Sequence, residues 1–273
     1  LIGVDQEGGK VRRLRPEAGF EDLCSAHQMG ADTNSTALTR AQAETTAAML
    51  AELGINCNFA PVVDLNTNPS NPVIGTLDRS FSDDPTDVAR HGAAWIEAHR
   101  AHHVLSCLKH FPGHGSSTVD SHLDFVDISD SWEPRELEPY RILLQQDLVD
   151  LVMTGHLFNK RLDGDHPATL SAPIIDGLLR TEIGYHGVVV SDDMQMKAIS
   201  DHYGFEEAVC RSLAAGVDML VFGNNLDYDP DICPRAISAI KDGLARGILR
   251  EERLLNSLGR IRKLKERLGN YHD

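Results

Sequence analysis

The chain has 273 residues, of which 41% are hydrophobic and 25% charged, so it can bury a sizeable core in one large domain or two small ones. Its formal net charge of -15 argues against a nucleic-acid or anionic-membrane partner, because both bind clustered positive charge, and no apolar run approaches the roughly 20 residues of a membrane-spanning helix. The cysteines have no C-x-x-C spacing, which indicates free thiols in a reducing compartment rather than a disulfide scaffold or a zinc ribbon.

Short apolar, β-branched runs alternate with longer amphipathic runs along the whole chain. The predicted strands are Leu1–Val4, Ile55–Val63, Val104–Lys109, Leu148–Thr154, Gly187–Ser191 and Val217–Phe222. The predicted helices are Thr36–Leu53, Pro85–Ala101, Glu133–Gln146, Pro173–Arg180, Phe205–Ala215, Pro234–Ala245 and Glu251–Leu268. No low-complexity linker divides them, so residues 1–273 are predicted to form one domain.

Regular alternation of strands and helices predicts an α/β fold in which parallel strands are joined by helical crossovers. An open doubly wound sheet and a closed (β/α)8 barrel both satisfy this pattern. The barrel is favoured because reactive side chains follow nearly every strand, and a barrel gathers its strand ends into one mouth. These groups are Asp5-Gln6-Glu7, Asp64, Lys109-His110, His156, Asp192-Asp193 and Asn224-Asn225. A barrel needs eight strands, so the chain is expected to lack its first two βα units.

The densest group of reactive residues is the run Lys109–Gly115, which is followed by Asp120-Ser121-His122. Its proline and glycines indicate a loop that leaves the strand end. An Asp two residues from a His on a loop can orient the imidazole and raise its basicity, which allows proton transfer near neutral pH. A solvated turn remains the alternative.

A second candidate is the strand end Ser191-Asp192-Asp193. Strand alternation places Asp192 on the same face as Val188 and Val190, so its carboxylate is predicted to point into the mouth. The alternative is that both aspartates cap the following helix. Asp193 is expected to be structural, near the start of that helix.

Several histidines at or just after strand ends raise the possibility of a metal site, namely His110, His114, His122 and His156. The sequence nevertheless contains no H-x-H on a strand and no H-E-x-x-H, which argues against a catalytic metal. It also contains no G-x-G-x-x-G and no P-loop, so we expect no nucleotide cofactor.

Taken in order along the whole chain, these motifs resemble glycoside hydrolase family 3, in its single-domain bacterial β-N-acetylglucosaminidase branch. The matching stretches are Val4–Val11, Phe59–Asp64, Asn71–Gly75, Arg79-Ser80-Phe81, Lys109–Gly115, Asp120-Ser121-His122, Met153–His156 and Ser191–Met196. The resemblance implies that Asp192 is the catalytic nucleophile, that His122 is the acid/base and that Asp120 is its partner. It implies that the sugar hydroxyls are held by Asp5, Arg13, Arg79, Lys109 and His110, and that His156 is the strand-end histidine of the branch.

The chain departs from the family pattern in two places. Thr76-Leu77-Asp78 lies between the Asn-Pro-Val-Ile-Gly and Arg-Ser-Phe motifs, which either displaces Arg79 or only bulges the loop. The two strands that precede the Asp-Gln-Glu-Gly-Gly strand in the family are also absent, and two βα units correspond to about 60 residues.

The resemblance implies a retaining exo-β-N-acetylglucosaminidase that releases terminal GlcNAc from bacterial cell-wall muropeptides and needs neither cofactor nor metal. The alternatives are a phosphorylase on the same scaffold, a metal-dependent barrel hydrolase and an inactive sugar-binding relative. A carbohydrate is thus the expected partner, and we expect a monomer. The cytoplasm is the expected location, unless a segment before Leu1 carries a secretion or lipoprotein signal.

Overall fold

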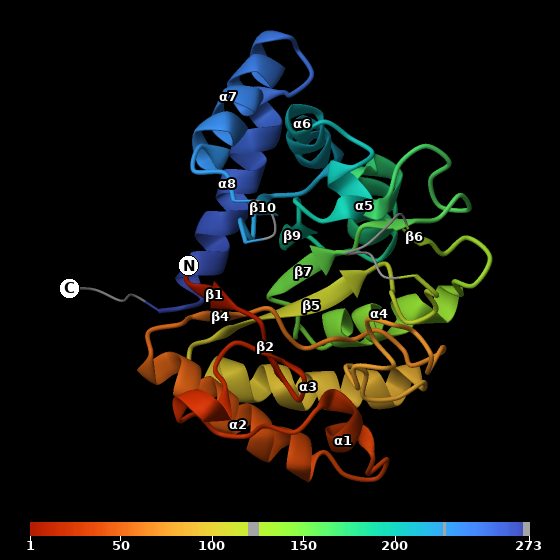
Figure 1. Cartoon of the computed structure of the whole chain (residues 1–273), viewed down its shortest axis with the longest axis vertical. Coiled ribbons are helices and arrows are strands. Elements are labelled where there is room, and N and C mark those ends of the chain that lie inside the picture. Colours follow the sequence, from red (N-terminus) through yellow and green to blue (C-terminus); the bar gives the residue numbers. More distant parts are fainter. Residues whose placement is uncertain (120–125, 226–227, 270–273) are drawn as a thin grey trace.

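The computed structural model describes residues 1–119, 126–225 and 228–269 (Figure 1). Its strands are β1 (Gly3–Val4), β2 (Gln6–Gly8), β3 (Val11–Arg12), β4 (Cys57–Asn58), β5 (Leu105–Phe111), β6 (Val126–Asp127), β7 (Leu151–Thr154), β8 (Leu157–Phe158), β9 (Val188–Asp193) and β10 (Met219–Val221). Its α-helices are α1 (Ala26–Gly30), α2 (Ala37–Glu52), α3 (Pro85–Ala101), α4 (Glu138–Gln145), α5 (Lys197–Ser200), α6 (Phe205–Ala215), α7 (Ile232–Ala245) and α8 (Glu251–Glu266). The remaining helical turns are η1 (Pro16–Ala18), η2 (Pro134–Leu137), η3 (Ala168–Leu170) and the π-helix η4 (Pro173–Glu182).

The main sheet contains all of the predicted strands. Its six strands lie in the order β1-β4-β5-β7-β9-β10. Every neighbouring pair is parallel, as predicted. The sheet curls into an open half-barrel with β1 and β10 at its edges, so the described residues do not form a closed barrel (Figure 1).

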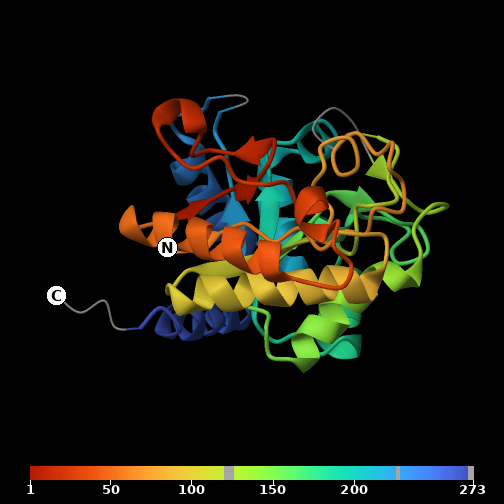
Figure 2. The ribbon, with the colours of Figure 1, turned by 90° about the horizontal axis from the view of Figure 1, so that it is seen from below.

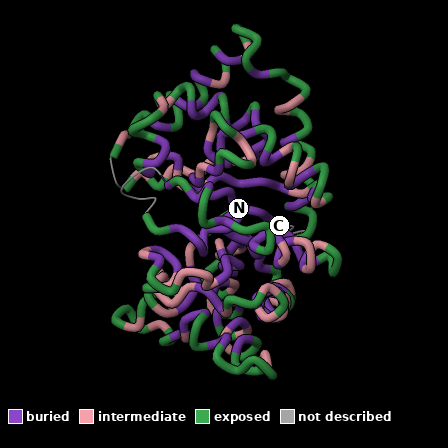
Figure 3. Tube along the Cα trace, turned by 90° about the vertical axis from the view of Figure 1, so that its right-hand side faces the viewer, coloured by how far each residue is buried: buried purple, intermediate pink, exposed green. Residues whose placement is uncertain are grey.

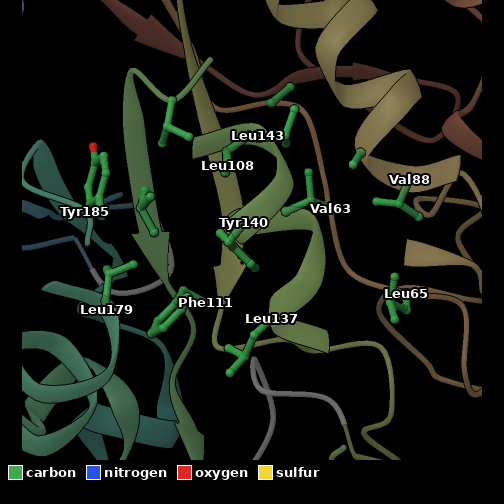
Figure 4. Packing of buried hydrophobic residues seen from close by; sticks show 14 of the residues in the cluster. Val63, Leu65, Val88, Leu108, Phe111, Leu137, Tyr140, Leu143, Leu179 and Tyr185 are labelled. Atoms are coloured by element: carbon green, nitrogen blue, oxygen red, sulfur yellow. The ribbon is translucent and has the colours of Figure 1, made fainter. Parts of the chain in front are cut away.

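The two faces of the sheet bury different clusters because alternate side chains of a strand point to opposite sides. Leu108, Val152 and Val189 face the larger cluster, which includes side chains of α3, α4 and η4. Figure 4 shows part of it, in which the rings of Phe111 and Tyr140 meet edge to face at 5.2 Å. The opposite side of the same strands faces a second, smaller cluster, closed by Leu264 and Leu268 near the end of the chain, to which these strands contribute Cys107, Leu151, Met153, Val188 and Val190.

Helices α2 and α3 lie side by side along one face of the sheet (Figure 2). Helix α3 begins where Asp84 accepts hydrogen bonds from the backbone N–H groups of Thr86 and Asp87, and Pro85 occupies its first turn. Both features reduce the number of unsatisfied backbone N–H groups at the start of the helix. They explain why the helix begins at the predicted residue. Buried chain is concentrated in the sheet and the inner sides of the helices (Figure 3).

Two predicted elements are shorter or divided. The predicted strand Ile55–Val63 is regular only over β4. Its backbone bonds to the neighbouring strands continue through Ala60 and are interrupted at Pro61, which has no N–H to donate; Val62 resumes contact by a single bridge to Lys109. The predicted helix Glu133–Gln146 is the 3-10 turn η2 followed by α4, because Pro139 cannot donate the hydrogen bond of a continuous helix.

Two small strand pairs were not predicted. The antiparallel pair β2–β3 places the Gln-Glu-Gly run in a short hairpin beside β1, and the parallel pair β6–β8 joins the chain after residue 125 to the chain after His156. Within the described ranges, no helix has both the length and the apolar character needed to cross a membrane.

Candidate active site

Three strands of the main sheet bring polar side chains together at their C-terminal ends. Asp5 follows β1, Lys109 lies in β5 and Asp192 lies in β9. Because the strands are parallel, their C-terminal ends all lie at the same edge, where barrel enzymes place their catalytic groups.

A chain of buried ion pairs connects these ends. The Lys109 ammonium lies 2.8 Å from Asp5 Oδ1 and 2.6 Å from Glu7 Oε1. Arg79 donates to the same Glu7 carboxylate through Nε and Nη2, each at 2.8 Å. Arg13 extends the chain at its exposed end, with Nη2 at 3.5 Å from Asp5 Oδ2. The structure thus unites four of the predicted sugar-binding residues in a single network.

The charges in this network hold one another in the ionised state. Burial raises the pKa of Glu7, but the positive charges of Arg79 and Lys109 outweigh it and lower the pKa to about 2. Burial lowers the pKa of Lys109, and the carboxylates of Asp5 and Glu7 reverse this and hold it above its ordinary value. Lys109, which is only 2% exposed, is therefore a buried residue that stays positively charged.

His110 is held by a second carboxylate, Asp64, in the segment after β4. Asp64 accepts the His110 backbone N–H at 3.0 Å, the ring Nδ1–H at 2.7 Å and the backbone N–H of His114 at 2.8 Å. Arg79 Nη2, which can only donate, lies 3.3 Å from His110 Nε2. The ring therefore carries its proton on Nδ1 and offers the lone pair of Nε2 toward Arg79.

Asp192 is the carboxylate at the end of β9. Burial would raise its pKa, but the imidazoles of His110 and His156, the backbone N–H of Asp193 and the ammonium of Lys109 together lower it. The Asp193 N–H donates to Asp192 Oδ1 at 2.8 Å. A half-buried carboxylate that stays ionised near the Lys109 ammonium can serve as a nucleophile.

Asp193 and His156 lie on the supporting side of this strand end. Asp193 Oδ1 accepts the backbone N–H groups of Gln195 and Gly223, each at 3.0 Å, so it fastens the turn after β9 to the end of β10. Helix α5 has no side-chain cap, which argues against the alternative in which the aspartates cap it. His156 Nε2 donates to the Asp193 carbonyl at 2.9 Å and its Nδ1 lies 2.8 Å from Thr169 Oγ1, so both ring nitrogens have protein partners.

The insertion Thr76-Leu77-Asp78 only bulges its loop. Its ends are held by Lys10, whose ammonium donates to the Thr76 carbonyl at 2.8 Å and lies 3.7 Å from Asp78. Arg79 remains in the ion-pair network described above, and its Nη1 also donates to the Val73 carbonyl at 2.9 Å.

The predicted acid/base pair, Asp120 and His122, lies outside the described residues. In the loop that leads to it, Asn71 holds the backbone and side chains of residues 114–117. Asn71 Nδ2 donates to the carbonyls of His114 and Gly115, at 2.7 and 3.1 Å, and lies 3.0 Å from Ser117 Oγ. The described chain continues after residue 125 with β6.

His110, His114 and His156 do not assemble a metal site in the part of the chain that the structure describes, where no group of three or more His, Cys, Asp or Glu could hold an ion. The His114 ring lies 2.8 Å from Ser117 Oγ, and burial lowers the pKa of His114 to about 4.

Glu7 and Asp64 are not among the predicted site residues, but both bind residues that are: Glu7 pairs with Lys109 and Arg79, and Asp64 orients His110. The available signal was that both acids follow predicted strands, where a buried acid must be paired with a positive group or hydrogen-bonded.

The chain matches the Glycosyl hydrolase family 3 N terminal domain over residues 1–264. It is 36% identical to the beta-hexosaminidase A of Pseudoalteromonas piscicida, over 98% of this chain and 47% of that protein. It is 40% identical to the beta-hexosaminidase LpqI of Mycobacterium tuberculosis, over 89% of this chain and 63% of that protein. The chain thus spans between about half and two thirds of the length of these relatives.

Solved structures give the same result. The glycoside hydrolase family 3 beta-N-acetylglucosaminidase of Paenibacillus sp. superimposes with a TM-score of 0.90 and 38% identity, covering 98% of this chain and 50% of that one. The structure of M. tuberculosis LpqI superimposes with a TM-score of 0.85 and 37% identity, covering 96% of this chain and 76% of that one. The chain therefore belongs to glycosyl hydrolase family 3, whose N-terminal domain it contains.

Proposed function

We propose that the protein is a retaining exo-β-N-acetylglucosaminidase with Asp192 as nucleophile and His122, oriented by Asp120, as acid/base. The observation that carries the proposal is the state of Asp192: a half-buried carboxylate with a lowered pKa, at the C-terminal end of β9 and close enough to Lys109 and His110 to be stabilised by them. The names of the relatives, beta-hexosaminidase and beta-N-acetylglucosaminidase, support the choice of sugar.

In the first step, Asp192 attacks the anomeric carbon and the bond to the leaving oxygen breaks, while His122 gives its proton to that oxygen. In the second step, His122 takes a proton from water, the water oxygen bonds to the anomeric carbon and the Asp192 carboxylate is released. The reaction needs no cofactor and no metal. A histidine takes the place of the usual second carboxylate of a glycosidase.

The ion-pair network supports a terminal sugar subsite. Asp5 is about one third exposed at its side chain, while Lys109 and Glu7 behind it are buried. Asp5 thus presents an acceptor to a sugar hydroxyl, and Lys109 holds that acceptor in place. Arg79, His110 and the more exposed Arg13 complete the proposed set around the ring.

Cell-wall muropeptides with a terminal GlcNAc are the substrate that we propose. The proposal rests on the resemblance of the motifs to the bacterial branch of the family. The protein's free cysteines support the further proposal that it acts in a reducing compartment, the cytoplasm.

We also propose that the six parallel strands form part of an eight-stranded barrel, completed by two βα units between β10 and β1. The open edges of the curled sheet support this. A structure of the protein in which β1 pairs with another strand on its free side tests it.

Rates on aryl N-acetylglucosaminide, aryl glucoside and aryl xyloside, with and without phosphate, test the proposed activity. We expect preference for the N-acetylglucosaminide, release of free sugar and no effect of chelators. Faster release with phosphate, together with a sugar phosphate product, would make the enzyme a phosphorylase. Cleavage of the other two glycosides without the first, or loss of activity in chelator, would contradict the proposal.

A further inference from the structure

The loop after β5 rests on a buried carboxyl group that the proposed mechanism does not use. Glu136, in η2, is 1% exposed. A β-carbon at Gly113 would lie 2.7 Å from Glu136 Cβ and 2.8 Å from its Oε2, so the carboxyl group touches the loop backbone. Glu136 Oε2 and the buried Ser116 Oγ each have no hydrogen-bond partner within the described ranges.

The other supports of this loop are insensitive to pH. Asn71 binds the carbonyls of His114 and Gly115, and Asn68 Nδ2 donates to the Ser117 carbonyl at 2.9 Å. Amide side chains do not titrate in the physiological range. A change in the charge of Glu136 would therefore act on a loop that is otherwise fixed.

The surroundings of Glu136 disfavour its charged form. Burial, together with the nearby Asp64 carboxylate, raises the pKa of Glu136 to about 7, and the nearby polar groups, including the backbone N–H of Glu133, offset this only in part. A carboxyl group of this kind is neutral in acid and becomes an anion within the physiological pH range.

The other titratable groups around Glu136 keep their state across that range. Burial raises the pKa of Asp64, but the contacts with His110 and His114 outweigh this and lower the pKa. Asp64 therefore stays ionised. The pKa of Tyr140, in α4, is raised well above its ordinary value by burial. The His114 ring on the loop is neutral, because burial lowers its pKa to about 4.

We propose that Glu136 is a positioning residue for loop 113–117, which it supports as a neutral acid and loosens when it ionises. The chain continues from this loop toward Asp120 and His122, so loosening would lower the rate of the reaction under the proposed function, on which this last link rests. At pH 8, a carboxyl group with a pKa of about 7 is ionised in about ten molecules for each neutral one.

Trp132 provides a reporter of the loop that does not depend on activity. Its buried indole N–H donates to the Pro112 carbonyl at 3.0 Å, at the start of the loop. The other tryptophan, Trp95, lies in α3, so a Trp95→Phe background isolates the emission of Trp132. In this background we expect the emission to change with a midpoint near pH 7.

Glu136→Gln, a neutral side chain of the same size, should abolish this transition. The matched control is Glu133→Gln: Glu133 lies in the same turn, but its side chain is 64% exposed, so the transition should persist. An unchanged transition in Glu136→Gln, or no transition in the Trp95→Phe background, would overturn the proposal.

Hydrogen exchange gives a second measurement on chains that keep both tryptophans. After correction for the intrinsic rate, amides of residues 113–117 should lose protection from pH 6 to pH 8, by up to about tenfold, in the wild type but not in Glu136→Gln. Equal losses in the two proteins would contradict the proposal.

Activity separates this proposal from the proposed function. In the wild type, kcat on aryl N-acetylglucosaminide should fall above about pH 7, and Glu136→Gln should move this fall to higher pH with little change in KM. A fluorescence transition that needs Glu136 in a protein without glycosidase activity would refute the proposed function alone. Activity with a fall that Glu136→Gln does not move would refute the role of Glu136 in catalysis.

Discussion

The carboxyl groups around the candidate site are held in different states by their neighbours. Glu7 lies between Lys109 and Arg79 and has a pKa of about 2, whereas Glu136 is buried near the Asp64 carboxylate and has a pKa of about 7. Asp192 resembles Glu7 in being kept ionised. Such separation of acids by environment is how one site supplies both anions and neutral acids at the same pH.

Replacing the proposed nucleophile should remove activity. Asp192→Asn cannot form the glycosyl-enzyme, so kcat should fall by several powers of ten, on the order of 10⁴ or more. Asp193→Asn is the matched control, because Asp193 binds backbone N–H groups and should affect stability more than chemistry. Equal losses of kcat in the two folded variants would contradict the assignment of Asp192.

His122→Ala tests the proposed acid role through the leaving group. An activated aryl group leaves without being protonated, whereas a sugar alcohol needs a proton to leave. In His122→Ala, glycosylation by a natural disaccharide should therefore slow more than glycosylation by the aryl substrate, by an additional factor of about 10²–10⁴. Asp120→Asn should show the same pattern more mildly. Pre-steady-state rates are required, because loss of the base also slows deglycosylation; an equal loss for both substrates would make His122 a binding residue.

Glu7 should make stability depend on pH in the acid range. Its folded pKa of about 2 lies below the ordinary value of 4.5, so its contribution is complete above pH 4.5 and is lost as the pH falls toward 2. By linkage the shift corresponds to about 3 kcal/mol. In urea unfolding, the difference between wild type and Glu7→Gln should shrink from pH 5 to pH 2.5; a constant difference would contradict this.

At the scale of elements, a buried aspartate fastens the N-terminal ends of the strands, which lie opposite the site, to helix α8. Asp218, just before β10, accepts the Val189 backbone N–H at 2.9 Å and the Arg180 guanidinium at 2.8 Å through Oδ2. Its Oδ1 accepts Ser257 Oγ at 2.6 Å and Arg260 Nη1 at 2.9 Å, both from α8. The chemistry and the anchoring therefore lie at opposite ends of the strands, as in barrel enzymes.

Asp218→Asn should lower stability without changing the chemistry. Removing the charge leaves buried Arg180 without its buried ion-pair partner and with only the half-exposed Asp176 carboxylate at 3.4 Å, and such changes cost about 3–5 kcal/mol. Asp147→Asn is the control, because that side chain is 93% exposed and 4.0 Å from Arg267, so its loss should cost less than about 1 kcal/mol. Urea unfolding of both variants measures the difference; similar small losses would contradict the anchoring role.

The elements that could be predicted are those with a local cause. The six strands and the bounds of α3 and α6 follow from periodicity, caps and glycine stops. The hairpin β2–β3 and the pair β6–β8 could not be predicted, because each strand has two or three residues and depends on contacts with distant chain. The division of the helix at Pro139 could have been read from the proline itself.

At the scale of the whole molecule, the candidate site combines residues from distant parts of the chain. Strand-end position and motif were enough to select Asp5, Arg79, Lys109 and Asp192, which the structure brings to one edge. The buried partner Glu7 was missed because periodicity marks which strand ends are polar, but not which acid pairs with which cation. Pairing is a three-dimensional property of the curled sheet.

The central claim is that Asp192 forms a covalent bond to the sugar, and trapping that bond tests it most directly. The purified protein is incubated with a mechanism-based fluorosugar analogue of the GlcNAc glycoside, and the labelled peptide is mapped by mass spectrometry. We predict one label per chain, on Asp192, that forms as activity is lost. A label on Asp193 or on any other residue, or an active enzyme that accumulates no label at all, would contradict the account.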